Sequence, residues 1–317
     1  MSVLFLSKGI LTTVQDLGRV GAARLGINPN GAMDKTAARS INILLGNGEN
    51  EAVLEMHFPA PVLQFEESAT ISFGGGDFGA HLNENPIENW RRIKVEKGDV
   101  LEFRRRVFGA RLYLSIRGGF QIPEWLGSRS TNLTAKIGGF EGRAIQKNDR
   151  LFFNQRTTSN EQRTNVKISP SLQPFYSRFP TVRVVAGAEW ENLTLESRET
   201  FLSNSFSIRR ESDRMGFRLS GDDLKLRERI ELLSSAVSFG TIQLLPDGQL
   251  IILMADHQTT GGYPRVGNVA KVDLPLLAQL NPGDTVNFYL ISIGEAENLL
   301  VQQEIELNYL RTAIRFL

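Results

Sequence analysis

The chain has no cysteine among its 317 residues. This absence excludes thiol nucleophiles, disulfide bonds and cysteine-ligated metal sites. Histidine is also scarce: only His57, His81 and His257 occur, and they lie far apart in the sequence. No carboxylate spacing completes a metal site with them, so the sequence predicts no metal.

Long apolar runs are missing as well, since none approaches the roughly 20 residues of a membrane helix. The N-terminal stretch "MSVLFLSKGILTTVQD" lacks the basic region and the small-residue cleavage site of a signal peptide. Lys plus Arg is 36 and Asp plus Glu is 35, so charge gives no reason to expect nucleic acid or an acidic membrane surface. The basic cluster at 104–111 alternates with apolar residues, as the solvated face of a hairpin does. We therefore expect a cytoplasmic protein that binds neither nucleic acid nor membrane.

Familiar catalytic motifs are absent too. The chain has no G-x-S-x-G elbow, no H-E-x-x-H pair and no Walker A pattern. The stretch "GGGDFG" at 74–79 has G-x-G-x-x-G spacing, but a dinucleotide site requires a helix directly after the glycines. The chain continues "AHLNENPIENW", which has no helical apolar period. This pattern favours a glycine-rich turn between strands.

Short runs rich in Val, Ile, Phe, Leu and Thr dominate the sequence, with Gly, Asn and Asp turns between them. They predict strands over residues 69–75, 99–105, 111–119, 181–187, 249–256 and 285–293. Helices are expected after the N-cap Asp34, from Asp273 to the residues before Pro282, and along the tail 295–316. The fold class is therefore mainly β, with barrels or sandwiches and a few helices.

A weak internal repeat supports two related domains. "EKGDVLEF" (96–103) and "NPGDTVNF" (281–288) share a Gly-Asp turn before an alternating strand, and "QKNDRLFF" (146–153) is a weaker copy. The polar, non-periodic region between the two halves reads as a linker. We predict an N-terminal domain over 1–155, a linker over 156–180 and a C-terminal domain over 181–317 that ends in a helix.

Four polar segments could carry chemistry: "TTVQDLGR", "NPNGAMDK", "SDRMGFRLSG" and "ADHQTTGGYP", the last directly after the apolar run "QLIILM". Arginine can clamp a carboxylate or phosphate through two hydrogen bonds, and glycine lets backbone amides approach a ligand. Each segment alone is typical of a structural turn; together they indicate one oxyanion-binding cleft. Predicted substrate-binding residues are Gln15, Arg19, Arg214, His257, Gln258, Thr259, Thr260, Gly261 and Gly262. Predicted catalytic residues are Asp16 and Asp34, as base or metal ligand, and Tyr263, as a wall or proton donor.

The same segments resemble the allophanate hydrolase subunit 2 family, also called the biotin-dependent carboxyltransferase family. The resemblance is carried in order by residues 11–47, 127–151, 212–221 and 245–284. It implies two cyclophilin-like β-barrel domains, in agreement with the strand-rich pattern. Two positions depart from the family pattern: Val20 follows Arg19 where the family has proline, and His257 stands where it has arginine. The second change replaces a permanent cation with a group that is largely neutral at pH 7.

The resemblance implies three alternative functions. The first is the C subunit of an ATP-dependent 5-oxoprolinase, which works with the A and B subunits to convert 5-oxo-L-proline to L-glutamate. The second is a regulatory antagonist of a histidine-kinase inhibitor that is similar to the B subunit. The third is a biotin-dependent carboxyltransferase that acts on a small urea-like amide. The chain has no biotin-carboxylase domain and no Met-Lys-Met biotinyl segment, which favours the first.

Overall fold

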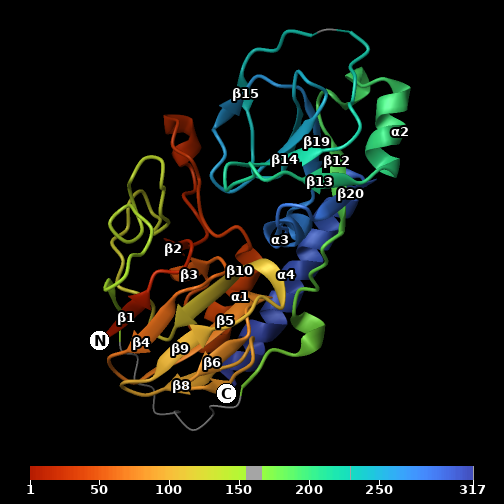
Figure 1. The fold of residues 1–317 in the computed structure, drawn as a ribbon. Helices are drawn as coiled ribbons and strands as arrows, with labels where there is room; N and C mark the ends of the chain where they lie inside the picture. The colour runs from red at the N-terminus through yellow and green to blue at the C-terminus, as the bar shows by residue number, and fades with distance from the viewer. Residues whose placement is uncertain (155–165, 229, 317) are drawn as a thin grey trace. The chain divides into compact units, whose positions relative to one another are not determined.

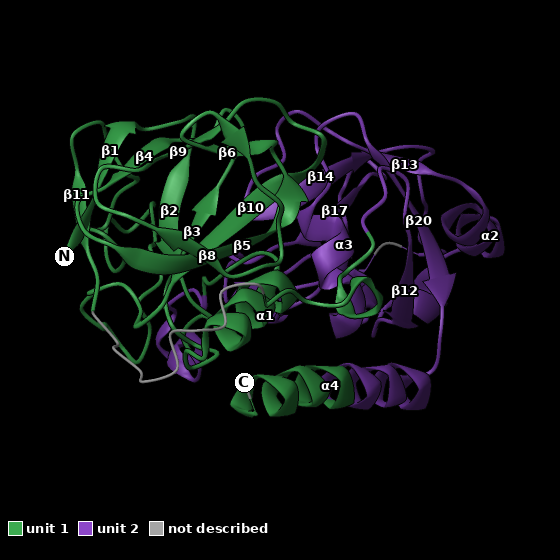
Figure 2. Cartoon of the chain, turned by 90° about the horizontal axis from the view of Figure 1, so that it is seen from below, with its two compact units in different colours: residues 1–19, 30–175, 305–317 green, residues 20–29, 176–304 purple. Residues whose placement is uncertain are grey.

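The structure, a computed structural model, describes residues 1–154, 166–228 and 230–316. The chain divides into two compact units, each described by itself below (Figure 2). Unit 1 comprises residues 1–19, 30–175 and 305–317, and unit 2 comprises residues 20–29 and 176–304. The predicted boundaries place residues 20–29 and 305–317 in the opposite domains. Of the predicted linker, residues 156–165 lie outside the described residues.

Unit 1 contains two antiparallel sheets (Figure 1). The first has the strand order β11 (Arg150–Phe152), β1 (Ser2–Ser7), β4 (Val62–Phe65), β9 (Val100–Phe103), β6 (Ala80–Leu82), β7 (Asn85–Pro86). The second has the order β2 (Thr12–Gln15), β3 (Val53–Met56), β10 (Phe108–Ile116), β5 (Ala69–Asp77), β8 (Ile93–Val95). Apolar side chains from both sheets form one core, in which the fully buried phenylalanines are Phe5, Phe65, Phe73, Phe78 and Phe153. The predicted mainly β class is confirmed.

Helix α1 (Lys35–Leu45) forms where the sequence predicts it. The Asp34 carboxylate accepts a hydrogen bond from the Ala37 N–H at 2.8 Å, which satisfies one of the free donors at the helix start. Gly46 ends the helix in a left-handed conformation. The apolar face, which includes Ile41 and Leu45, is buried as the helix packs on β5 and β10.

Three glycines of "GGGDFG", Gly74, Gly75 and Gly76, lie inside strand β5, which extends beyond the predicted strand 69–75, whereas Gly79 lies between β5 and β6 with a φ of 58°. A side chain on Gly74 would meet the Trp90 ring at 2.5 Å, so the missing side chain makes room for the indole. The next element is strand β6, and the absence of a following helix agrees with rejecting a dinucleotide site.

One residue of the basic cluster is also placed differently from the expectation. Arg104 and Arg105 are exposed, but Arg111 is buried within β10, where its Nε lies 3.9 Å from the Glu55 carboxylate. The Tyr113 hydroxyl donates to the same carboxylate at 2.8 Å. Burial raises the pKa of Tyr113 well above its usual value, and the charge of Glu55 adds to this shift.

Unit 2 is built around a closed barrel. Its strand order is β12 (Thr181–Ala186), β19 (Arg265–Val269), β16 (Thr241–Leu244), β17 (Leu250–Leu253), β14 (Gly216–Ser220), β13 (Phe206–Ile208), β20 (Thr285–Leu290). Strands β12 and β20 close the barrel as a parallel pair. Inside, the rings of Phe201 and Phe288 stack with centroids 4.5 Å apart, and Phe206 packs beside both.

The remaining elements are short, with one exception. The helices are α2 (Leu195–Ser203), α3 (Leu274–Ala278) and the long C-terminal α4 (Ile293–Arg315). The 3₁₀ turns are η1 (Ala22–Leu25), η2 (Pro170–Leu172), η3 (Trp190–Asn192) and η4 (Lys271–Asp273), and β15 (Ser235–Ala236) pairs with β18 (Thr260–Gly261). No helix within the described residues is both long enough and apolar enough to cross a membrane.

The repeated Gly-Asp motif forms the same turn three times. In each copy the aspartate N–H donates to the carbonyl three residues earlier, and the aspartate carboxylate accepts from the N–H of that same earlier residue. The pairs are Asp99 with Glu96, Asp284 with Asn281, and Asp149 with Gln146. The residue before each aspartate has positive φ, namely 93° at Gly98, 90° at Gly283 and 71° at Asn148. The turns lead into β9, β20 and β11, so the repeat is a shared strand-starting device.

This backbone conformation can be tested by adding a methyl group at a turn glycine. We expect Gly283→Ala to lower the free energy of unfolding by about 1–2 kcal/mol, because L-residues are strained at positive φ although open space surrounds the site. Gly294→Ala is the matched control, since Gly294 lies in the first turn of α4 with open space around it and alanine favours a helix by up to about 1 kcal/mol. Chemical denaturation should therefore give opposite signs for the two variants; equal effects would contradict the turn assignment.

Candidate functional site

The polar loop 254–264 leaves the barrel at the end of β17 and returns to it at β19. Its first residues stay close to strand β14 through the backbone, since Met254 N–H donates to the Met215 carbonyl and Asp256 N–H to the Arg214 carbonyl. The loop therefore begins from a fixed backbone position within unit 2.

Arg214 and Asp256 form a bidentate ion pair at this point. Arg214 Nε and Nη2 donate to the two Asp256 carboxylate oxygens at 2.9 and 2.8 Å. The side chains are only 7% and 15% exposed, so water competes weakly for the pair. In this structure the carboxylate that Arg214 clamps belongs to the protein's own loop; its clamping of a substrate stays a prediction.

His257 is also engaged by backbone. Its Nδ1 lies 2.5 Å from the Gln258 carbonyl, and because a carbonyl only accepts, Nδ1 is the donor. The side chain of Asn28, which belongs to unit 2, donates to the carbonyls of Asp256 at 2.8 Å and His257 at 2.7 Å. The buried His257 thus belongs to the support of the loop, whereas the next residue, Gln258, is partly exposed.

The far end of the loop is held by two further contacts. Thr260 and Gly261 pair with β15, and a side chain on Gly261 would meet Gln243 Nε2 at 2.7 Å. Beyond them, the Glu189 carboxylate accepts from the Arg265 N–H at 2.7 Å and from the Arg265 guanidinium at 3.0 and 3.1 Å. Both ends of the loop are therefore pinned by an arginine–carboxylate pair.

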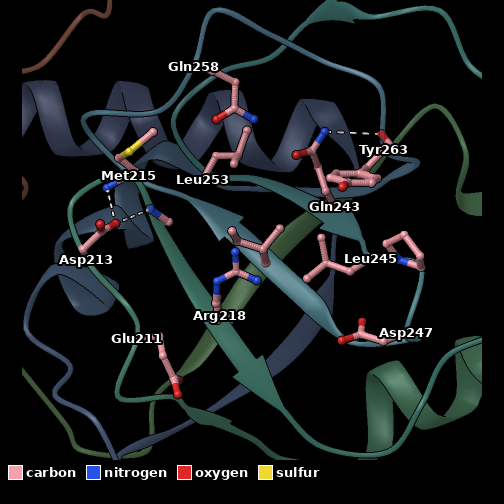
Figure 3. A pocket seen from close by; sticks show the side chains of 13 residues that line it. Glu211, Asp213, Met215, Arg218, Gln243, Leu245, Asp247, Leu253, Gln258 and Tyr263 are labelled. Atoms are coloured by element: carbon pink, nitrogen blue, oxygen red, sulfur yellow. Dashed lines mark hydrogen bonds between the residues drawn. The ribbon is translucent and has the colours of Figure 1, made fainter. Parts of the chain in front are cut away.

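A cavity of about 590 Å³ opens beside this loop on the strands β14, β16 and β17 (Figure 3). This volume is within the range of roughly 300–1,000 Å³ that is usual for small-molecule sites. Its apolar lining comes from Met215, Leu245, Pro246, Ile251 and Leu253. Its polar lining comes from Glu211, Asp213, Arg218, Gln243, Asp247, Gln258 and Tyr263.

The three carboxylates in the lining already have partners. Asp213 accepts from the N–H groups of Met215 and Gly216 at 2.8 and 3.2 Å, and Asp247 accepts from Gln249 N–H at 3.1 Å. Glu211 forms an ion pair with Arg209, and its own backbone N–H, Arg209 and the nearby charge of Arg218 lower the pKa of Glu211.

Arg218 and Gln258 are two polar side chains in the lining that can bind a ligand. Within the described residues, neither the Arg218 guanidinium nor the Gln258 amide makes a hydrogen bond, and both line the cavity (Figure 3). Tyr263, 46% exposed, stands at the rim. The cavity can thus offer a cation and an amide to a small polar molecule.

In unit 1, Asp16 organises a buried loop. Its carboxylate accepts from the hydroxyls of Ser128 and Ser130 at 2.7 and 2.5 Å, and from the N–H groups of Gly18 and Arg129 at 2.8 and 2.6 Å. Four donors on a carboxylate that is 1% exposed favour a structural role. A catalytic role for Asp16 stays a prediction.

Arg19 and Gln15 lie in the same buried region of unit 1. The Arg19 guanidinium donates to Asn30 Oδ1 at 2.8 Å and to the Ser130 carbonyl at 2.5 Å, and it stacks on Trp125 with 4.9 Å to the ring centroid. Gln15 Nε2 donates to Thr13 Oγ1 at 3.1 Å. Asp34 caps α1, as described above. Of the four polar segments, "TTVQDLGR" belongs to unit 1, "SDRMGFRLSG" and "ADHQTTGGYP" belong to unit 2, and "NPNGAMDK" has residues in both; their predicted single cleft stays a prediction.

The comparisons with known proteins can be set beside this geometry. The model of the carboxyltransferase domain, subdomain A and B, matches residues 25–290. The chain belongs to this family. The match covers parts of both units, and it confirms the resemblance inferred from the sequence. Among the described residues, no group of three or more His, Asp or Glu side chains is arranged to hold a metal ion.

Two bacterial family members match the chain over nearly its full length, and both are named as the C subunit of 5-oxoprolinase. The protein of Haemophilus influenzae is 39% identical over 302 residues, which are 95% of each chain. The protein of Escherichia coli is 35% identical over 288 residues, 91% of each chain. The word "subunit" in both names describes part of a larger enzyme.

Larger fungal relatives contain one region that is similar to this chain. The urea amidolyase of Lachancea kluyveri is 31% identical over 318 residues, which are 94% of this chain and 17% of that protein. The crystal structure of the K. lactis urea amidolyase matches with a TM-score of 0.91 and 31% identity, covering 98% of this chain and 20% of that one. The chain therefore spans about a fifth of the length of these larger relatives.

Sequence reasoning missed three residues of the unit 2 site. Arg218 lies within the segment "SDRMGFRLSG", but its outward direction depends on the register of β14 with β17. Gln243 is a polar residue inside the apolar strand β16, a signal that could have identified it. Asn28 is the first residue of "NPNGAMDK", but no local pattern reveals its contact with a loop more than 200 residues away.

The Arg214–Asp256 pair yields a stability prediction. We expect Asp256→Asn to lower the free energy of unfolding of unit 2 by about 3–5 kcal/mol, because the buried Arg214 charge loses its counter-charge. Arg209→Ala is the control: it breaks the pair with Glu211, whose side chains are 40% and 62% exposed, and should cost at most about 1 kcal/mol. Thermal and chemical denaturation of both variants measure the difference. Similar costs for the two would contradict the supporting role.

The Glu189–Arg265 contact yields a pH prediction. Burial raises the pKa of Glu189. The hydrogen bonds from Arg265 lower it by more than burial raises it, so the net shift is downward. A lowered carboxyl pKa stabilises the fold above the unfolded pKa, and this contribution is lost as pH falls through the folded pKa. Glu189→Gln should therefore cost about 1–3 kcal/mol at pH 7 and much less near pH 3. A cost independent of pH, measured by urea denaturation at both values, would contradict the assignment.

Proposed function

We propose that this chain is the C subunit of a bacterial ATP-dependent 5-oxoprolinase, acting with the A and B subunits to hydrolyse 5-oxo-L-proline to L-glutamate. The observation that carries the proposal is the near end-to-end match to two proteins named as this subunit. The match covers 95% and 91% of the length of those two proteins, but only 17% and 20% of the two fungal enzymes.

The reaction explains what such a subunit must contribute. A lactam carbonyl is a poor electrophile and its nitrogen is a poor leaving group, so ATP, as the co-substrate of the complex, would supply the activation of the carbonyl. The protein must hold the small substrate in place and exclude bulk water. In unit 2 the supported loop offers Gln258 to orient the substrate, whereas the next four residues, Thr259, Thr260, Gly261 and Gly262, lie outside the lining of the cavity. Tyr263 at the rim would form a wall of the site or deliver a proton.

Reconstitution tests this function. Purified A and B subunits, mixed with this chain, ATP and 5-oxo-L-proline, should release glutamate, and omission of any one protein should abolish the product. Glutamate formation that is equal with and without this chain would contradict the proposal. The same assay distinguishes the enzyme subunit from the regulatory alternative. In that alternative this chain binds a kinase inhibitor that is similar to the B subunit, and it does not support turnover.

A second candidate is carboxyl transfer from biotin to a small urea-like amide. The family name and the matches to urea amidolyases favour it. This activity requires a biotinylated carrier protein and bicarbonate, which the hydrolysis does not. Product formation that depends on both reagents would support this candidate, and turnover that is indifferent to both would exclude it.

A further inference from the structure

We propose that the cavity of unit 2 recognises a cyclic amide that carries a carboxylate, through three polar side chains of which two were not identified by the sequence. Arg218 binds the carboxylate, the Gln243 oxygen accepts from the amide N–H, and the Gln258 amide group donates to the amide carbonyl. The identity of this ligand as 5-oxo-L-proline rests on the proposed function; the recognition chemistry rests on the cavity itself.

Arg218 is the cation of the site. Its backbone is fixed twice, by pairing with Ile251 of β17 and by a hydrogen bond from its N–H to the Ser212 hydroxyl at 3.0 Å. Figure 3 shows the guanidinium extending into the middle of the cavity, while the nearby carboxylates of Asp213 and Asp247 bind backbone N–H groups. A planar guanidinium suits bidentate binding of a ligand carboxylate.

Gln243 has a defined orientation although it lies in a strand. Its side chain is 1% exposed, and the amide atom that faces the loop lies 3.3 Å from the Tyr263 carbonyl oxygen. Because a carbonyl only accepts, that atom must be the Nε2 donor. Its Oε1 accepts no hydrogen bond from the described residues and is directed toward the Gln258 side in Figure 3. This oxygen is therefore an acceptor for a ligand N–H.

Gln258 lines the same cavity as Gln243 and lies on the loop that Arg214 and Asn28 hold in place (Figure 3). Its amide group makes no hydrogen bond with the described residues, so its two N–H donors are available to a ligand carbonyl. An acceptor from Gln243 and donors from Gln258 match the N–H and C=O of one amide group. Leu245, Ile251 and Leu253 supply an apolar surface for the ring carbons.

The charge pattern disfavours two other ligands. A polyphosphate would meet one guanidinium, whose charge already interacts with Glu211, and the negative charges of Glu211, Asp213 and Asp247, so the ATP phosphates are not expected here. Urea would satisfy the two glutamines but has no carboxylate, so Arg218 would add nothing to its binding. A carboxylate-bearing lactam is the ligand class that uses all three side chains.

The test compares two lactams that differ only in the carboxylate. The intact chain, alone and in complex with the A and B subunits, is titrated with 5-oxo-L-proline and with 2-pyrrolidinone, by NMR or calorimetry. The native chain should prefer 5-oxo-L-proline by about tenfold or more, the range of a charge-assisted hydrogen bond. Arg218→Ala should reduce that ratio to near one and leave the affinity for 2-pyrrolidinone unchanged. Arg218→Lys should keep part of the preference.

Two controls separate recognition from folding. Arg210→Ala removes the same charge from an exposed position outside the cavity and should keep the full preference. Gln258→Ala should weaken both lactams alike, because both contain the amide. An unchanged preference in a folded Arg218→Ala chain, or no binding of 5-oxo-L-proline in either the isolated chain or the complex, overturns the inference.

Steady-state kinetics of the reconstituted complex distinguish this inference from the proposed function. If glutamate is formed and Arg218→Ala raises KM for 5-oxo-L-proline with little change in kcat, both hold. If glutamate is formed but Arg218→Ala has no effect on KM, the function stands and the cavity assignment is wrong. If no glutamate is formed although the chain shows the lactam preference, the cavity assignment stands and the function is wrong.

Discussion

The functional surface of unit 2 depends on one bidentate ion pair, between Arg214 and Asp256. Strand β17 brings an apolar run into the barrel, and the chain that follows must leave it with its backbone groups hydrogen-bonded. The ion pair fixes the first turn of that exit, and Asn28 satisfies the carbonyls of Asp256 and His257. With the Asp256 carboxylate on Arg214 and the His257 ring on the Gln258 carbonyl, Gln258 is the first polar side chain of the loop that makes no hydrogen bond with the described residues. Arg214, which the sequence predicts as a ligand clamp, thus supports the loop that carries Gln258, the residue proposed to meet the ligand.

Residues of the same type have different roles in this chain according to what surrounds them. Arg19 in unit 1 is 2% exposed and binds Asn30, Ser130 and the Trp125 ring, whereas Arg218 in unit 2 extends into a cavity. Asp16 collects four internal donors, much as Asp213 binds two backbone N–H groups. A charged residue in a polar segment therefore says little about function until its partners are known, and the groups without partners mark the site.

The sequence predicts those features that depend on neighbouring residues. Asp34 and Gly46 bound α1 as expected, and the Gly-Asp turns at Gly98 and Gly283 start β9 and β20, because capping and positive φ are local chemistry. Features that depend on distant residues could not be predicted. A side chain on Gly74 would collide with the Trp90 ring, and Arg214 meets a carboxylate 42 residues away. The direction of Arg218 follows from strand register, which a pattern of single residues does not fix.

A crystal structure of the chain with bound 5-oxo-L-proline tests the central claim most directly. We predict the ligand carboxylate on the Arg218 guanidinium and the lactam between Gln243 and Gln258, with the Arg214–Asp256 pair unchanged. Ligand bound elsewhere in the chain, with the cavity of unit 2 empty, would contradict the claim. So would a bound ligand whose carboxylate displaces Asp256 from Arg214, because the pair would then be a substrate clamp and not the support of the loop.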